Sequence, residues 1–101
     1  MPHFVVTFRI ASDATYQERY ESFVDKAREI AGGGGYCWEE TTSFYAFKAA
    51  GTANSVCEAL YFGTQFSPFK DTMVVIDLDN RQKAVKGYVQ YPHTLDGAIG
   101  F

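Results

Sequence analysis

The residue with the clearest chemical potential is Arg9, which lies inside the alternating apolar run of residues 4–10. A charged side chain in such a run needs a partner, because an unpaired charge is costly to bury. One role is a salt bridge to Asp77, Glu39 or Glu40. The other is a clamp that holds an anion or a carboxylate in the fork of the guanidinium. The sequence leaves both roles open and favours the salt bridge.

Three carboxylates lie near predicted strands, and two of them, Asp13 and Asp77, are further candidate site residues. Asp77 and Asp79 stand two residues apart, so both would point the same way from one strand and could offer oxygens to Mg²⁺. Asp79 and Asn80 are also typical of a turn, and this structural role is favoured. Asp13 is the carboxylate nearest to residues 4–10 and precedes a predicted helix, where capping is its favoured role.

The other reactive residue types are scattered along the chain. The two histidines, His3 and His93, lie near opposite ends, and Cys37 and Cys57 have no neighbours at the spacing of a zinc or redox site. No P-loop or nucleophile-elbow pattern occurs, and the glycines at 32–35 follow a predicted helix, whereas phosphate cradles precede one. We therefore predict no metal site and no cofactor.

Composition limits the class of protein. At 101 residues and 47% hydrophobic, the chain has the size of a single domain. The formal net charge is −3 and the nine basic residues form no cluster, so nucleic acid remains a possible partner that the charge does not support. No leader or apolar span is visible, and we expect a cytoplasmic protein without a membrane partner.

Periodicity and capping signals predict the elements that must position these residues. Thr15 and Glu18 suggest a capping box at the start of the first helix, and Thr52 suggests the cap of the second. The predicted elements are strand 4–10, helix 16–31, strands 36–40 and 43–48, a helix after Thr52, strand 72–78 and a short strand at 83–91.

This order of elements predicts an α+β fold, the ferredoxin-like βαββαβ sandwich. Its antiparallel sheet would carry two helices on one face and a short C-terminal fifth strand. We expect residues 1–91 to form the single domain. Residues 92–101 show no clear period, so we expect a tail that is mobile or lies across another subunit.

An aromatic content of 17% is high for a core of this size, which indicates a buried second face. Sheet pairing in a homodimer would bury that face. The interface candidates are Trp38, Tyr45, Phe47 and Tyr88. The loop residues Phe66 and Phe69 are expected to pack against the core or a partner.

Four segments together resemble a known family. Residues 8–10, 20–23, 38–47 and 73–78 fall in the order seen in the small proteins related to CRISPR-associated protein 2 and virulence-associated protein D, over residues 3–79. The resemblance implies a dimer that pairs through the C-terminal fifth strand, here residues 83–91. It also implies, for some members, cleavage of RNA or DNA by a metal-bound Asp at the end of the first strand.

Arg9 occupies the position of that Asp in this chain. A guanidinium is permanently charged and cannot bind a hard cation, so metal-dependent nuclease activity is expected to be lost. The favoured function is a homodimeric protein of this fold without catalysis. The alternatives are a dimeric α+β barrel enzyme that encloses a small apolar ligand, and a toxin-type ribonuclease.

Overall fold

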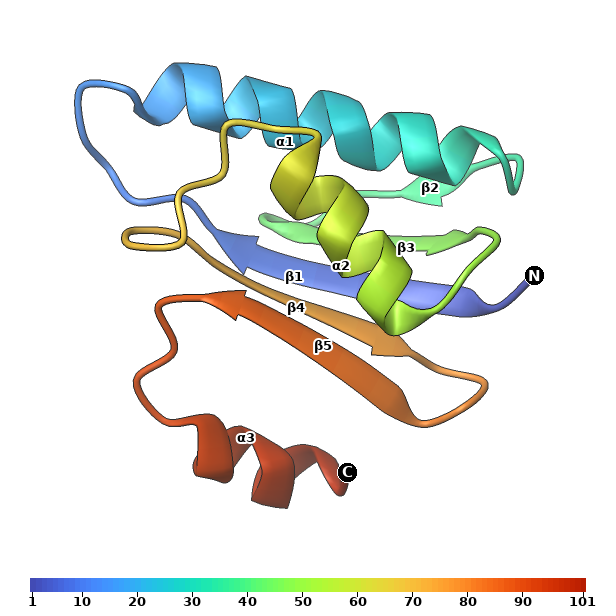
Figure 1. The fold of residues 1–101 in the computed structure, drawn as a ribbon. Helices are drawn as coiled ribbons and strands as arrows, with labels where there is room; N and C mark the ends of the chain where they lie inside the picture. Colours follow the sequence, from blue (N-terminus) through green and yellow to red (C-terminus); the bar gives the residue numbers. More distant parts are fainter.

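A five-stranded antiparallel sheet and three helices make up the computed structural model, which describes residues 1–101 (Figure 1). The strands lie in the order β2-β3-β1-β4-β5. In chain order the elements are β1 (His3–Arg9), α1 (Tyr16–Gly32), β2 (Cys37–Trp38), β3 (Phe44–Lys48), α2 (Ala53–Phe62), β4 (Thr72–Asp77), β5 (Gln82–Gly87) and α3 (Pro92–Ile99).

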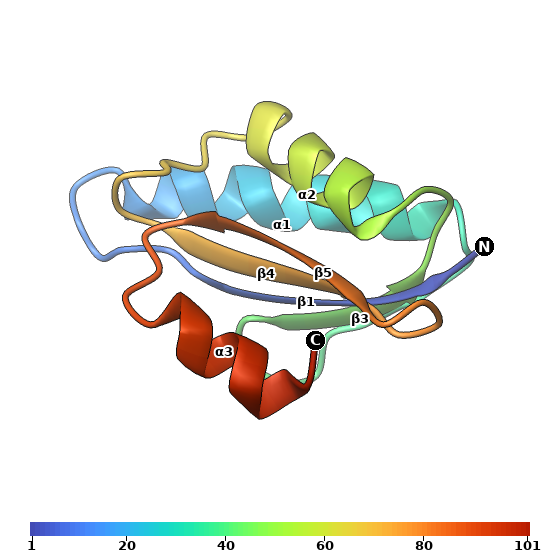
Figure 2. The same ribbon diagram turned by 60° about the horizontal axis from the view of Figure 1, so that its bottom comes forward.

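The core lies between the sheet and the helices α1 and α2, which share one side of it (Figure 2). Alternation along β1 sends Phe4, Val6 and Phe8 into this layer. Phe23 from α1 and Leu60 from α2 meet them there and are fully buried. Burial of each such side chain stabilises the fold by about 1.5–3 kcal/mol. The α+β class predicted from the sequence is confirmed at this level.

Helix α1 begins where the sequence predicts, although its capping box does not form. The Thr15 side chain makes no cap hydrogen bond. Instead, the carboxylate of Asp13 accepts the Thr15 backbone N–H at 2.8 Å. The predicted partner Glu18 is exposed and takes no part. Asp13 therefore satisfies the Thr15 N–H, the donor that the capping-box pattern assigned to the carboxylate of Glu18.

Helix α2 is capped as predicted. The Thr52 hydroxyl accepts the Ser55 N–H at 3.1 Å, and the Ser55 hydroxyl accepts the Thr52 N–H at 2.8 Å, which completes a capping box. The helix ends before Gly63, whose backbone N–H donates to the Ala59 carbonyl. Local chemistry alone accounts for both ends of this helix.

The register of β3 overturns two of the four interface candidates. Tyr45 and Phe47 pair with Val6 and Phe4 of β1, so all four point into the core. Only 4% of Tyr45 and 5% of Phe47 is exposed, which leaves neither for a partner. Trp38, on the two-residue strand β2, points to the opposite face and is 43% exposed.

Strand β5 pairs with β4 of its own chain over its whole length. The exchange of this strand between two subunits stays a prediction, since the structure contains a single chain. The strand also ends at Gly87 instead of residue 91, because Gly87 turns the chain with a φ of 98°. Tyr88, the fourth interface candidate, follows this turn and is 56% exposed.

The segment predicted as an irregular tail contains the helix α3. Pro92 stands at its start, where a missing N–H costs nothing. The helix lies on the opposite side of the sheet from α1 and α2 (Figure 2) and buries no residue. An ion pair of 2.8 Å between Lys83 and Asp96 links it to β5.

Two further predictions concern exposed surfaces. Phe66 packs into the core as expected, whereas Phe69 is 88% exposed and does not. None of the three helices combines the length and the apolar character that a membrane span requires.

Candidate functional site

The face of the sheet turned away from α1 and α2 is called the open face below. Paired residues of neighbouring strands share a face, so the register defines its members. They are His3, Val5, Thr7 and Arg9 of β1, Trp38 of β2, Phe44, Ala46 and Lys48 of β3, Thr72, Val74 and Ile76 of β4, and Lys83, Val85 and Gly87 of β5.

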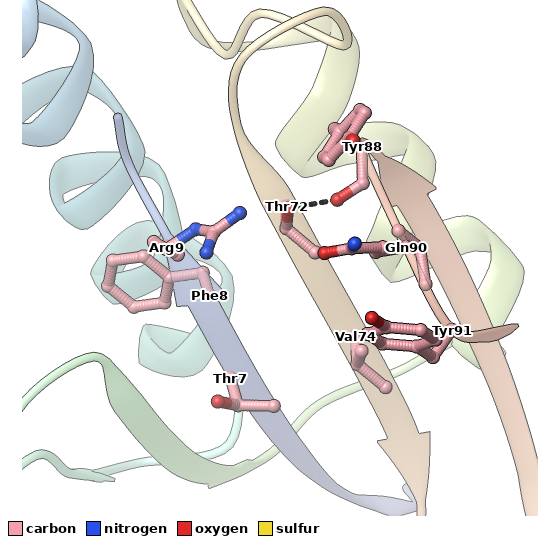
Figure 3. A pocket seen from close by; sticks show the side chains of 9 residues that line it. Thr7, Phe8, Arg9, Thr72, Val74, Tyr88, Gln90 and Tyr91 are labelled. Atoms are coloured by element: carbon pink, nitrogen blue, oxygen red, sulfur yellow. Dashed lines mark hydrogen bonds between the residues drawn. The ribbon is translucent and has the colours of Figure 1, made fainter. Parts of the chain in front are cut away.

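A groove of about 380 Å³ crosses one end of the open face (Figure 3). Its walls are β1 and β4 on one side and the segment after β5 on the other. Its lining residues are Thr7, Phe8, Arg9, Thr72, Val74, Tyr88, Val89, Gln90 and Tyr91. No aspartate or glutamate lines this groove.

Arg9 is the last residue of β1 and projects from the open face. Its partner across the ladder is Thr72, whereas Asp77 lies opposite Phe4 at the other end of the strand. Arg9 lies five positions along β1 from Phe4, or about 17 Å at the usual rise per residue. The predicted salt bridge between Arg9 and Asp77 is therefore wrong.

The two glutamates considered for Arg9 are not its partners either. Glu39 is bound by Arg28 at 2.5 Å, and this ion pair lowers the pKa of the glutamate carboxyl. Glu40 forms no ion pair with Arg9. The guanidinium of Arg9 extends across the groove toward Thr72 (Figure 3). It is exposed and has no carboxylate beside it.

The wall opposite Arg9 is tied to β4. The Thr72 hydroxyl donates to the Tyr88 carbonyl, and the Tyr88 N–H donates to the Asp71 carbonyl at 2.9 Å. Gly87 permits this close approach, since a Cβ on it would lie 1.9 Å from the Asp71 carbonyl oxygen. The groove therefore has two fixed walls.

Asp77 is buried at the turn after β4. One of its oxygens accepts the N–H groups of Asp79 and Asn80, each at 3.0 Å, and the other accepts the Asn80 side-chain amide at 2.8 Å. These bonds, that of the Asn80 amide first, lower the pKa of the Asp77 carboxyl. Asp79 instead contacts His3 at the surface. The two carboxylates do not converge, and Asp77 has the turn-forming role.

Asp13 belongs to a charge cluster that the sequence did not reveal. It accepts from Lys70 and from Arg19, each at 2.7 Å. Lys70 first and then Arg19 hold the pKa of the Asp13 carboxyl well below its usual range. Arg19 is buried and also binds the fully buried Asp71 at 3.1 Å. Asp71 first and then Asp13 raise the pKa of the Arg19 guanidinium above its usual value.

Sequence reasoning placed Arg19 on the outer face of α1, among the other polar residues. The one signal that could have revealed this cluster is that Asp13 and Asp71 both lie beside turns. In the structure each of these carboxylates contacts a long cationic side chain. No three histidine, cysteine, aspartate or glutamate side chains gather in a group that could hold a metal ion.

Comparison with known proteins gives no relative. The chain matches no family model, no curated protein and no solved structure.

Proposed function

We propose that the chain is a homodimeric binding protein with a ferredoxin-like fold similar to CRISPR-associated protein 2, without metal-dependent nuclease activity. The fold part of this proposal is supported by the βαββαβ order of the first six elements. It is also supported by the antiparallel order β2-β3-β1-β4, with α1 and α2 on one side.

The observation that carries the dimer is the polarity of the open face. Its centre is apolar, with Val5 of β1, Val74 and Ile76 of β4 and Val85 of β5 side by side. The charged members of the face, such as Arg9 and Lys48, stand toward strand ends. An apolar centre within a charged rim is the usual anatomy of a protein interface.

A second copy is the occupant that best fits this surface. Helix α3 lies on the same side of the sheet and buries none of its own residues, so it does not seal the centre. In a two-fold dimer the same patch meets itself, which places apolar centre against apolar centre. The residues of the open face include no carboxylate, which argues against a basic protein as the partner.

The absence of nuclease chemistry is supported by the state of the nearby carboxylates. Arg9 replaces the expected Asp at the end of β1. Asp13 is engaged by Lys70 and Arg19, and Asp77 by three donors of its own turn. A carboxylate that already holds cations or N–H groups is a poor ligand for Mg²⁺.

The barrel-enzyme alternative receives no support from the structure. It requires an apolar ligand between the sheet and the helices, and this space is filled by side chains such as Phe4, Phe23 and Met73.

Light scattering of the purified protein after gel filtration tests the dimer. Val85→Lys puts a charge at the apolar centre of the open face, on a side chain that is 37% exposed. We expect the unmodified protein to be a dimer and this variant to dissociate at concentrations at least about tenfold higher. Phe62→Lys is the matched control, because Phe62 is exposed on α2 at the other side of the sheet.

A monomer at every concentration tested, or equal dissociation in the control, would overturn the dimer. The nuclease part is tested separately with single-stranded RNA and duplex DNA in Mg²⁺ or Mn²⁺. We expect no cleavage. Cleavage that disappears in Asp13→Ala or Asp77→Ala would favour a ribonuclease of the toxin type.

A further inference from the structure

Arg9 differs from the other arginines of the chain. Those three each donate to an oxygen of this protein, at Asp71, Glu39 and Gly100. Arg9 makes no side-chain hydrogen bond and no ion pair, although acidic residues outnumber basic ones by 12 to 9. Its cation therefore faces a groove in which the protein supplies no counter-charge.

The groove has a polar end and an apolar end. Gln90 points its amide into the gap from the wall opposite Arg9, and the Thr72 hydroxyl lies between them (Figure 3). At the other end the Tyr91 ring lies beside the Val74 side chain. An amphipathic ligand would find donors for its charged group and a flat surface for its body.

The size and rigidity of the groove suit a small molecule. Its volume of about 380 Å³ lies in the range of small-ligand sites. The bonds of Tyr88 to β4 and the turn at Gly87 hold the far wall in place. A ligand would meet preformed walls, which reduces the entropy lost on binding.

We propose that this groove binds a small oxyanion, a carboxylate or a phosphate, attached to an aromatic or apolar group. The fork of the Arg9 guanidinium matches two oxygens of either anion with parallel N–H donors. The Gln90 amide donates a further hydrogen bond, and the apolar group rests on Tyr91 and Val74. The lack of any carboxylate in the lining makes the groove selective for anions. The groove shares Arg9 and Val74 with the open face that carries the proposed dimer, so its test includes the oligomeric state.

A titration followed by ¹⁵N–¹H NMR tests this site with two probes, benzoate and phenyl phosphate, at constant ionic strength. We expect saturable shifts at Arg9, Thr72, Gln90 and Tyr91 with at least one probe. The probe that binds more tightly identifies the preferred oxyanion.

The variant Arg9→Gln removes the charge from an exposed side chain and is expected to weaken binding at least about tenfold. Arg9→Lys keeps the charge without the fork and should also bind more weakly. Lys48→Gln is the matched control, since Lys48 is exposed on the same open face and outside the groove. It should bind as the unmodified protein does.

Three results would overturn the site: no saturation with either probe, equal binding by Arg9→Gln, or equal weakening in Lys48→Gln. Light scattering of Arg9→Gln separates this inference from the dimer. An unchanged mass with lost probe binding assigns the effect to the groove alone, whereas a changed mass would overturn that assignment.

Discussion

Asp71 holds together three segments that are distant in sequence. Its carboxylate accepts the N–H groups of Ala11 and Ser67, each at 2.9 Å, and two donors of Arg19 at 3.1 and 3.2 Å. Both charged residues are buried. The pair therefore joins the chain after β1, the first turn of α1 and the loop before β4.

The substitution Asp71→Asn is expected to lower the free energy of unfolding by about 3–5 kcal/mol, because it leaves the buried charge of Arg19 without a full partner. Urea denaturation measures the loss. Asp13→Asn is the control, because the Asp13 side chain is 32% exposed and water can replace part of its contacts. An equal loss in both variants would show that burial of Asp71 is not the cause.

The turn after β5 is the element on which the groove depends. Gly87 combines a φ of 98° with the close approach to the Asp71 carbonyl. Residues with a side chain are strained in this conformation. The position of Tyr88 to Tyr91 thus follows from one glycine and not from the strand pattern around it.

We expect Gly87→Ala to destabilise the protein by about 1–3 kcal/mol, since the added Cβ is strained and displaces β4 or the turn. Thermal unfolding measures this effect. Gly97→Ala is the matched control, because Gly97 lies within α3 with open space around it and alanine favours helices. The explanation fails if both substitutions have the same effect.

At the scale of the whole molecule, the two sides of the sheet are unequal. One side carries the core and the two helices that bury it. On the other side α3 buries none of its residues. The whole chain is nevertheless compact, because its radius of gyration of 12.8 Å is close to the value of about 13 Å for a folded chain of this length. Helix α3 therefore stays near the sheet with few contacts to protect it.

Hydrogen exchange should reveal this asymmetry. Amides of α3 are expected to exchange fastest among the helices, while those of the central strands β1 and β4 exchange slowest, because local opening costs least where little is buried. Exchange measured by mass spectrometry at low protein concentration checks this order. Protection of α3 equal to that of β1 would contradict it.

Several features of this protein follow from the sequence alone. The span of α1, the capping of α2 by Thr52, the stop at Gly63 and the alternation of β1 depend on residues close in the chain, so their patterns predict them. The resemblance to a nucleic-acid-processing family and the dimer remain predictions, since they concern other molecules.

Only the tertiary structure decided the remaining features. A strand has two faces, and its register on a neighbour determines which one is buried, so Tyr45 and Phe47 turned out to be core residues. The burial of Arg19 required Asp71, which is 52 residues away. Arg9 lacks a partner because the register places Asp77 at the far end of β1. Each outcome depends on contacts between distant residues, which local patterns do not contain.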